Sequence, residues 1–129
     1  MPEPQERAID STELGPGLVI ALRRPDPGVR ILRVTGELHE TNAVQLRLAV
    51  LEQLVLLPRL LVLDLTRVSA LTPLAVEGLV QAAQDARRAA IALRIVPPLG
   101  PLPEALHAKR HVFDLRAGLE EAVQQFPHI

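Results

Sequence analysis

The chain has 129 residues, enough for one domain and too few for two ordinary ones. Aromatic residues make up only 2%, which argues against modules that stack bases or sugars on aromatic rings. The formal net charge is -1 and there is no cysteine, so nothing favours nucleic-acid binding, disulfides or thiol catalysis. No apolar run is long enough to span a bilayer, and the polar start carries no signal pattern. We therefore predict a cytoplasmic protein that neither binds nucleic acid nor inserts into a membrane.

The start of the chain predicts a lead-in followed by a hairpin. Residues 1–16 are polar and proline-bearing, and we expect a flexible lead-in that leaves residues 17–129 as the folded domain. Apolar runs at residues 18–22 and 29–34 predict two strands. Between them, Pro25-Asp26-Pro27-Gly28 favours a turn, because proline fixes φ and glycine accepts positive φ.

A helix with two apolar rows follows the hairpin. It is predicted from Asn42, which we expect at the N-cap, until Pro58 ends it. The first row is expected to face the core and comprises Val44, Leu48, Leu51 and Val55. The second row suits either a neighbouring helix of the same domain or an interface with a second copy of the chain or another protein. It comprises Leu46, Val50, Leu54 and Leu57.

The second half of the chain predicts alternating strands and helices. The unbroken apolar run at residues 60–65 is typical of a central strand covered on both faces. A helix is predicted from Pro73 to Ala89, with Thr72 as its N-cap. Its small residues favour close packing against the sheet, or against a partner helix if they face outward. They are Ala75, Gly78, Ala82 and Ala86.

The remaining residues complete the predicted fold. They predict a strand at 91–96, a short helix at 104–108, a last strand at 112–115 and a C-terminal helix at 118–126. The resulting order, ββαβαβαβα, indicates the α/β class: a single domain with a mixed sheet of four to five strands and about four helices.

Several segments resemble the STAS domain, the module of sulfate transporters and anti-sigma factor antagonists. Val34-Thr35-Gly36-Glu37-Leu38-His39 resembles the G-E-L-D strand end of that family. Residues 61–71 are similar to its buried strand and turn, and residues 72–79 fall where the family has D-S-S-G-L-G-V-L. Residues 118–123 are similar to the opening of its last helix. The resemblance covers residues 17–125 and implies one STAS-like domain.

The resemblance also implies a phosphorylation site that this chain has lost. In antagonists of the family, the first serine of D-S-S-G is phosphorylated by a kinase that is itself the anti-sigma factor. Its counterpart here is Pro73, which has no hydroxyl group, so the switch cannot operate at its usual position. The preceding Thr72 keeps a hydroxyl group and is a candidate for a displaced phosphosite, besides its expected role as a helix cap.

A function follows from the resemblance. It implies a non-enzymatic bacterial signalling domain in transcription regulation that binds an anti-sigma factor or a related kinase-like ATPase. We expect the partner to contact the loop after the first G-E-L strand and the start of the second helix. These residues are Glu37, His39, Thr41, Ser69, Thr72, Pro73, Leu74 and Glu77. Two alternatives stay open: a cytoplasmic accessory subunit of a lipid-transport ABC transporter, and a nucleotide-binding regulatory domain.

Motifs for catalysis or cofactor binding are absent from the sequence. There is no Walker loop, no G-x-G-x-x-G and no nucleophile–base pair. His107 and His111 have a spacing that suits a metal, but no third ligand stands beside them. We therefore predict no catalytic residue, no metal site and no cofactor.

Overall fold

The computed structural model describes residues 11–13 and 18–124. The elements in chain order are β1 (Ser11–Glu13), β2 (Leu18–Asp26), β3 (Val29–Leu38), α2 (Glu40–Val55), β4 (Leu60–Leu71), α3 (Pro73–Arg88), β5 (Ala92–Val96), α4 (Glu104–Ala108), the 3₁₀ helix η1 (Arg110–Val112) and α5 (Leu119–Gln124).

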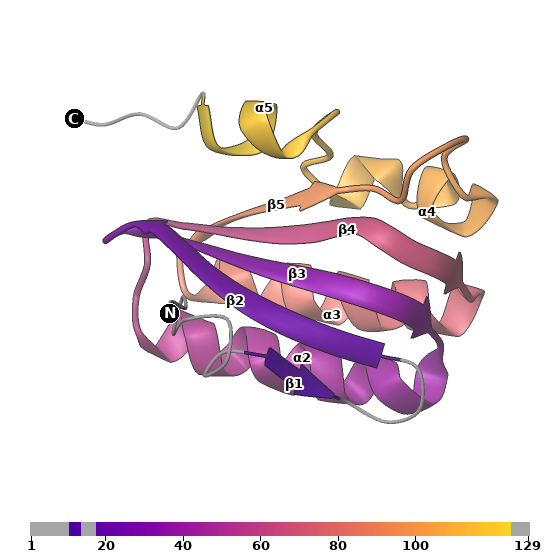
Figure 1. Ribbon diagram of the computed structural model, residues 1–129, viewed down its shortest axis with the longest axis horizontal. Coiled ribbons are helices and arrows are strands. Elements are labelled where there is room, and N and C mark those ends of the chain that lie inside the picture. Colours follow the sequence, from indigo (N-terminus) through magenta and orange to yellow (C-terminus); the bar gives the residue numbers. More distant parts are fainter. Residues whose placement is uncertain (1–10, 14–17, 125–129) are drawn as a thin grey trace, which may run out of the picture.

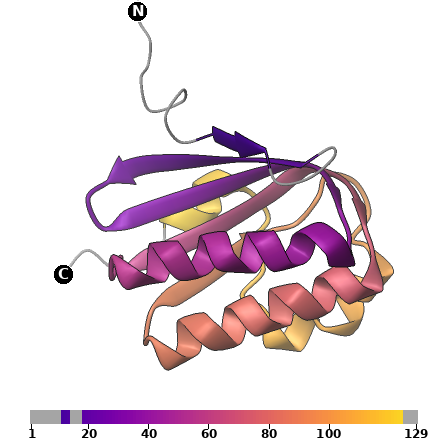
Figure 2. The same cartoon turned by 90° about the horizontal axis from the view of Figure 1, so that it is seen from below.

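The strands form one mixed sheet in the order β1-β2-β3-β4-β5. β2 pairs antiparallel with β1 and β3, whereas β4 pairs parallel with β3 and β5. Helices α2 and α3 cover one face of the sheet, and α5 lies on the opposite side (Figures 1 and 2). The predicted α/β class, single domain and mixed sheet are confirmed.

The central strand β4 explains why its sequence lacks alternation. Leu61, Leu63 and Leu65 belong to the core beneath α2 and α3. Leu60 and Val62 belong to a second cluster, which includes Ala122 of α5. Because both faces of the strand are covered, every position from 60 to 65 is buried.

The rotation of α2 about its axis differs from the prediction. Leu46, Val50 and Leu54 face the core, whereas the row expected there is exposed or half-buried. That row is Val44, Leu48, Leu51 and Val55. The prediction was wrong because the two rows are equally apolar, so hydrophobicity alone does not choose between them.

Two contacts fix the observed rotation of α2. Asn42, expected at the N-cap, lies inside the helix and is only 2% exposed, while His39 takes the N-cap position. Gly78 of α3 approaches Ala43 so closely that a Cβ atom on the glycine would lie 3.1 Å from the Ala43 Cβ. The helix therefore turns residues 42 and 43 inward.

The C-terminal part departs from the prediction at one element. The strand expected at residues 112–115 is reduced to a single parallel bridge between Ile95 and Leu115. Arg110–Val112 forms η1 instead, and Phe113 is buried in the main core. The backbone pairs with β5 through two hydrogen bonds, from the Ile95 N–H to the Asp114 carbonyl and from the Arg116 N–H to the Ile95 carbonyl, both 2.9 Å.

The chain ends lie mostly outside the described residues. Within the expected lead-in, Ser11–Glu13 pairs with β2, Thr12 lying beside Ile20. Residues 1–10 and 14–17 are not described, so the division into a lead-in and a domain starting at residue 17 stays a prediction. The expected last helix is observed as Leu119–Gln124, and its final predicted residues also lie outside the described range.

Candidate functional site

The carboxyl ends of β3 and β4 meet at one edge of the sheet. These strands are parallel neighbours, so Glu37 lies beside Ala70 and Leu38 beside Leu71. The Thr72 N–H donates to the Leu38 carbonyl at 3.2 Å, which joins the two strand ends after the last paired residues. Helix α2 follows β3 directly and α3 follows β4, so both helix N-termini open at this edge (Figure 1).

Asn42 organises the end of β3 and the start of α2. Its Oδ1 accepts a hydrogen bond from the His39 N–H at 2.9 Å, and its Nδ2 donates to the Glu37 carbonyl at 2.9 Å. Gly36, just before Glu37, has φ of 118°, which glycine adopts without steric cost at this irregular point of the ladder. The loop is therefore held by hydrogen bonds between the Asn42 side chain and the backbone, and the Glu37 side chain is left exposed.

Thr72 and Pro73 set the start of α3. The Thr72 Oγ1 accepts a hydrogen bond from the Ala75 N–H at 3.2 Å, which confirms the predicted N-cap. Pro73 occupies the first helical position, where its missing N–H leaves no intrahelical bond unmade. Leu74 follows with 57% of its surface exposed. The predicted start of this helix is confirmed.

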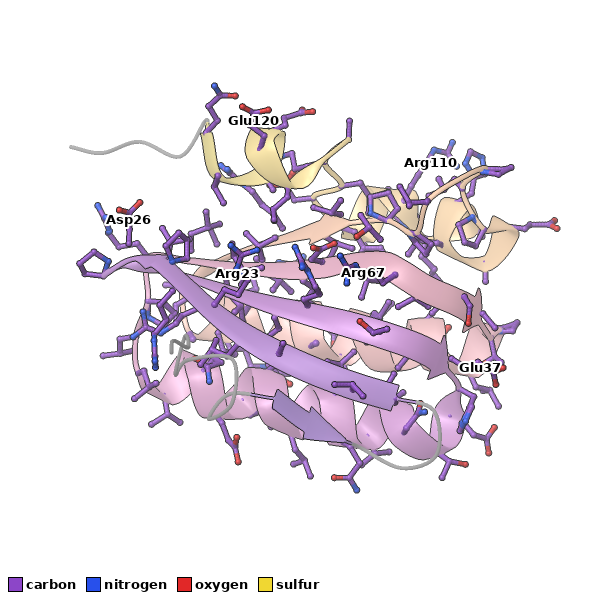
Figure 3. The ribbon with its side chains drawn as sticks, viewed as in Figure 1. Arg23, Asp26, Glu37, Arg67, Arg110 and Glu120 are labelled. Carbon is purple, nitrogen blue, oxygen red and sulfur yellow. The ribbon has the colours of Figure 1, made fainter. Side chains whose placement is uncertain are left out.

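All eight residues expected to contact a partner lie on or beside this edge, and we call them the strand-end surface. Apart from His39 and Thr72, which are half-buried, they are exposed. The set comprises Glu37, His39, Thr41, Ser69, Thr72, Pro73, Leu74 and Glu77. Glu37 lies at the end of β3 away from Arg23 and Asp26, which are nearer the hairpin (Figure 3). The Glu77 carboxylate lies 3.5 Å from the Lys109 Nζ, so it also links α3 to the end of α4.

A groove of about 370 Å³ runs between α2 and α3 and borders the strand-end surface at Leu74. Its lining residues are Glu40, Ala43, Val44, Arg47, Leu74, Gly78 and Gln81. Ala75, Ala82 and Ala86 of α3 are buried in the core. Of the two interpretations of these small residues, packing within the domain is therefore the one that the structure supports. Sequence reasoning missed the groove because it assigned Val44 to the core.

An ion pair between Arg47 of α2 and Asp85 of α3 joins the two helices. Arg47 Nε donates to Asp85 Oδ2 at 2.7 Å, and Nη2 donates to Oδ1 at 3.1 Å. The hydrogen bond from Arg47 lowers the pKa of the Asp85 carboxyl group, although burial opposes this shift. Asp85 is thus held ionised and helps fix α2 against α3.

The other polar candidates have structural surroundings. Asp64 is 2% exposed and accepts hydrogen bonds from Arg33 Nε at 3.2 Å and from the Thr66 N–H and Oγ1 at 3.0 and 2.7 Å. His107 lies in α4 and His111 in η1, so they do not share one helix face. Within residues 11–13 and 18–124, no three histidine or carboxylate residues gather where they could hold a metal ion.

No helix in the described ranges has the length and apolar character needed to cross a membrane. The arrangement of the strand-end surface, with an exposed leucine, an exposed proline and flanking carboxylates, suits contact with another protein surface.

Comparison with solved structures shows the fold. An anti-sigma factor antagonist from Mycobacterium paratuberculosis aligns with a TM-score of 0.71 at 20% identity, covering 88% of this chain and 97% of that chain. The anti-sigma factor antagonist SpoIIAA in its unphosphorylated form aligns with a TM-score of 0.68 at 15% identity, covering 82% and 94%. The murine anion transporter Slc26a9 aligns with a TM-score of 0.62 at 13% identity, covering 88% of this chain and 21% of that chain.

Sequence comparison shows the family. No curated protein sequence gives a significant match. A family model described as STAS domain matches residues 22–122, which include every element from β3 to η1. The resemblance drawn from the sequence is thereby confirmed, and the chain belongs to the STAS domain family.

Proposed function

We propose that this chain is a regulatory domain that acts by binding a protein, in the manner of an anti-sigma factor antagonist, and that its partner docks on the strand-end surface. The observation that carries the proposal is the parallel pairing of β3 and β4. This pairing brings two segments that are separated by α2 in sequence to one exposed edge. The partner would be an anti-sigma factor, as the names of the structural relatives suggest, or a related kinase-like ATPase, as the family resemblance implies.

Leu74 is the anchor we assign to this contact. It is 57% exposed beside the exposed Pro73, and both are fixed by the first turn of α3. An exposed apolar side chain that its helix already holds in place loses little entropy on binding, which favours Leu74 as an anchor. Glu37 is exposed near the edge of this area, so a matching partner would offer an apolar socket with basic groups beside it.

The contact would not be switched by phosphate at residue 73. Pro73 stands where the family resemblance places the phosphorylated serine, and it carries no hydroxyl group. The neighbouring Thr72 uses its Oγ1 to accept from the Ala75 N–H, so its hydroxyl group is already engaged in capping α3. We therefore propose a surface that stays unmodified, and Thr72, next to Pro73, is the candidate for a displaced phosphosite against which this proposal is tested.

Titration calorimetry against the kinase-like anti-sigma factors of the source genome tests the docking site. Leu74→Glu should weaken binding at least about 30-fold, the effect of losing an interface hot spot. Leu99→Glu is the matched control, since Leu99 is 79% exposed and lies in the loop after β5. Equal affinities for the two variants, with both folded by circular dichroism, would place the contact elsewhere.

The same partners test the absence of a switch. After incubation with kinase and ATP, intact-mass measurement should show no added phosphate, and peptide mapping should find Thr72 unmodified. Phosphate on Thr72 would contradict the proposal of an unmodified surface. Capture of a lipid-transporter ATPase in place of any anti-sigma factor would favour the accessory-subunit alternative, and saturable ATP or GTP binding by the chain alone would favour the nucleotide-binding one.

A further inference from the structure

A continuous apolar row lies on the outer face of α2. Val44, Leu48 and Val55 are 59%, 49% and 77% exposed, and Leu51 between them is half-buried where it packs against the edge of the main core. We call these four residues the α2 stripe. A contiguous apolar surface of this kind on a folded domain marks an interaction site, since single scattered apolar residues are ordinary but a row is not.

Two further exposed leucines, Leu56 and Leu57, follow α2 in the turn. Leu57 has φ of 56°, a left-handed conformation that costs a non-glycine residue about 1–2 kcal/mol. Its side chain is nevertheless 74% exposed, and that of Leu56 is 59% exposed.

The spacing of the α2 stripe is that of a coiled-coil seam. Its residues are separated by four, three and four positions, which places Leu48 and Val55 at heptad position a, and Val44 and Leu51 at position d. This spacing fits a second helix with the same repeat, because side chains at a and d interlock with those of a facing helix.

The charged residues beside the α2 stripe match those of a second copy of α2. With Leu48 at position a, Arg47 occupies the preceding g position and Glu52 the following e position. In a parallel pair of helices, a g residue faces the e residue that lies five positions further along the other helix. Arg47 and Glu52 are five positions apart and carry opposite charges, so Arg47 of one copy would face Glu52 of the other. Glu52 is exposed. Arg47 also bonds Asp85 within its own chain, but those two hydrogen bonds use Nε and Nη2 and not Nη1, which is the atom we expect to face Glu52.

We propose that the α2 stripe is the interface of a parallel homodimer of this chain. Val44, Leu48 and Val55 of each copy pack against the same residues of the other copy across a two-fold axis, and Arg47 of each copy faces Glu52 of the other. The occupant is a second copy because the g and e charges of α2 match α2 itself. The seam is two heptads long, so we expect a dissociation constant of about 10–500 µM.

Sedimentation equilibrium on the purified chain, with no partner present, tests the dimer separately from the proposed function. From about 5 µM to about 1 mM, the wild-type chain should shift from monomer to dimer. Leu48→Glu should remain monomeric throughout with an unchanged melting temperature, and the control Leu99→Glu should dimerise as the wild type does. Glu52→Arg should weaken the dimer about tenfold, because two attractive pairs become repulsive. A monomeric wild-type chain at the highest concentration, or dimerisation of Leu48→Glu, would overturn the proposal.

Introduced cysteines test the parallel arrangement, since the chain has no cysteine of its own. Under mild oxidation, Val44→Cys and Val55→Cys should each form a disulfide with the same residue of a second copy, because a parallel seam brings identical positions together. Leu99→Cys should stay monomeric. If neither variant cross-links alone but a mixture of the two does, the helices are antiparallel and the proposed arrangement is wrong.

Discussion

Arg47 on α2 and Asp85 on α3 form a two-point ion pair that holds the two helices in register. Their shorter contact, from Nε to Oδ2, is 2.7 Å, and Asp85 is only 8% exposed. Arg88, one turn along α3, lies 3.4 Å from the second carboxylate oxygen. Hydrogen bonding to Arg47 lowers the pKa of Asp85, so the folded chain holds this group as a carboxylate to a lower pH than the unfolded chain does.

The first prediction concerns how the stability of the fold changes as the pH is lowered. Because the pKa of Asp85 is lowered on folding, its contribution is fully present above the ordinary carboxyl pKa of about 4 and is lost as the pH falls toward the folded value. Asp85→Asn should therefore have a lower melting temperature than the wild type at about pH 7, and the gap should narrow below about pH 4. Thermal unfolding followed by circular dichroism measures both. Glu120→Gln, on an exposed residue of α5, should show no such pattern (Figure 3).

The second prediction concerns the close approach of the two helices at Gly78. A Cβ atom there would already lie 3.1 Å from the Ala43 Cβ, so a larger side chain must push α2 and α3 apart. Gly78→Val should lower the free energy of unfolding by about 1–3 kcal/mol, the usual range for overpacking. Gln81→Val is the control, because it adds the same β-branched side chain to an exposed position of α3. Equal effects in urea denaturation would mean that the helix contact is less tight than described.

The third prediction uses two adjacent leucines after α2. Leu57 has φ of 56°, whereas the preceding Leu56 has φ of -81°. Leu57→Gly should raise the free energy of unfolding by about 0.5–1 kcal/mol, because glycine adopts the left-handed conformation without the steric cost. Leu56→Gly should lower it, since there glycine only adds entropy to the unfolded chain. Urea denaturation at low protein concentration, where the chain is monomeric, compares the two. A loss of stability in both variants would show that the left-handed turn carries no strain.

Much of the fold is encoded locally and could be predicted. The unbroken run at residues 60–65 identifies a strand covered on both faces, and Thr72 with Pro73 marks the start of α3 through capping alone. The meeting of the Glu37 and Thr72 segments follows from topology, since consecutive parallel strands end at the same edge. These features depend on neighbours in sequence or on a simple rule of connection.

The rotation of α2 depends on contacts between distant residues and could not be predicted. Leu46 and Leu48 are chemically identical, and the choice between them is made by the fit of Ala43 against Gly78. The sequence did contain a signal for His39 as the N-cap, since Asn42 follows three residues later, which is the spacing of a capping interaction. The prediction instead placed Asn42 itself at the N-cap. The strand expected at 112–115 failed for a different reason: the burial of Phe113 and the turn at η1 leave only one bridge with β5.

The fourth prediction concerns Asn42, the buried amide that joins the end of β3 to α2. Asn42→Ala removes its acceptor for the His39 N–H and its donor to the Glu37 carbonyl, leaving both groups without this partner. It should lower the free energy of unfolding by about 1–3 kcal/mol, as expected when buried polar groups lose their partners. Gln45→Ala, on the exposed side of the same helix, should change it little.

Asn42→Asp separates the two bonds of that amide. The aspartate keeps an acceptor for the His39 N–H but places a second oxygen against the Glu37 carbonyl and a charge at a position only 2% exposed, so it should lower the free energy of unfolding at least as much as Asn42→Ala does. Hydrogen exchange of the His39 amide should remain slow in Asn42→Asp and become fast in Asn42→Ala. Fast exchange in both variants would show that the bond to Glu37 holds the loop. Slow exchange in both would mean that Asn42 does not organise this end of the strand-end surface.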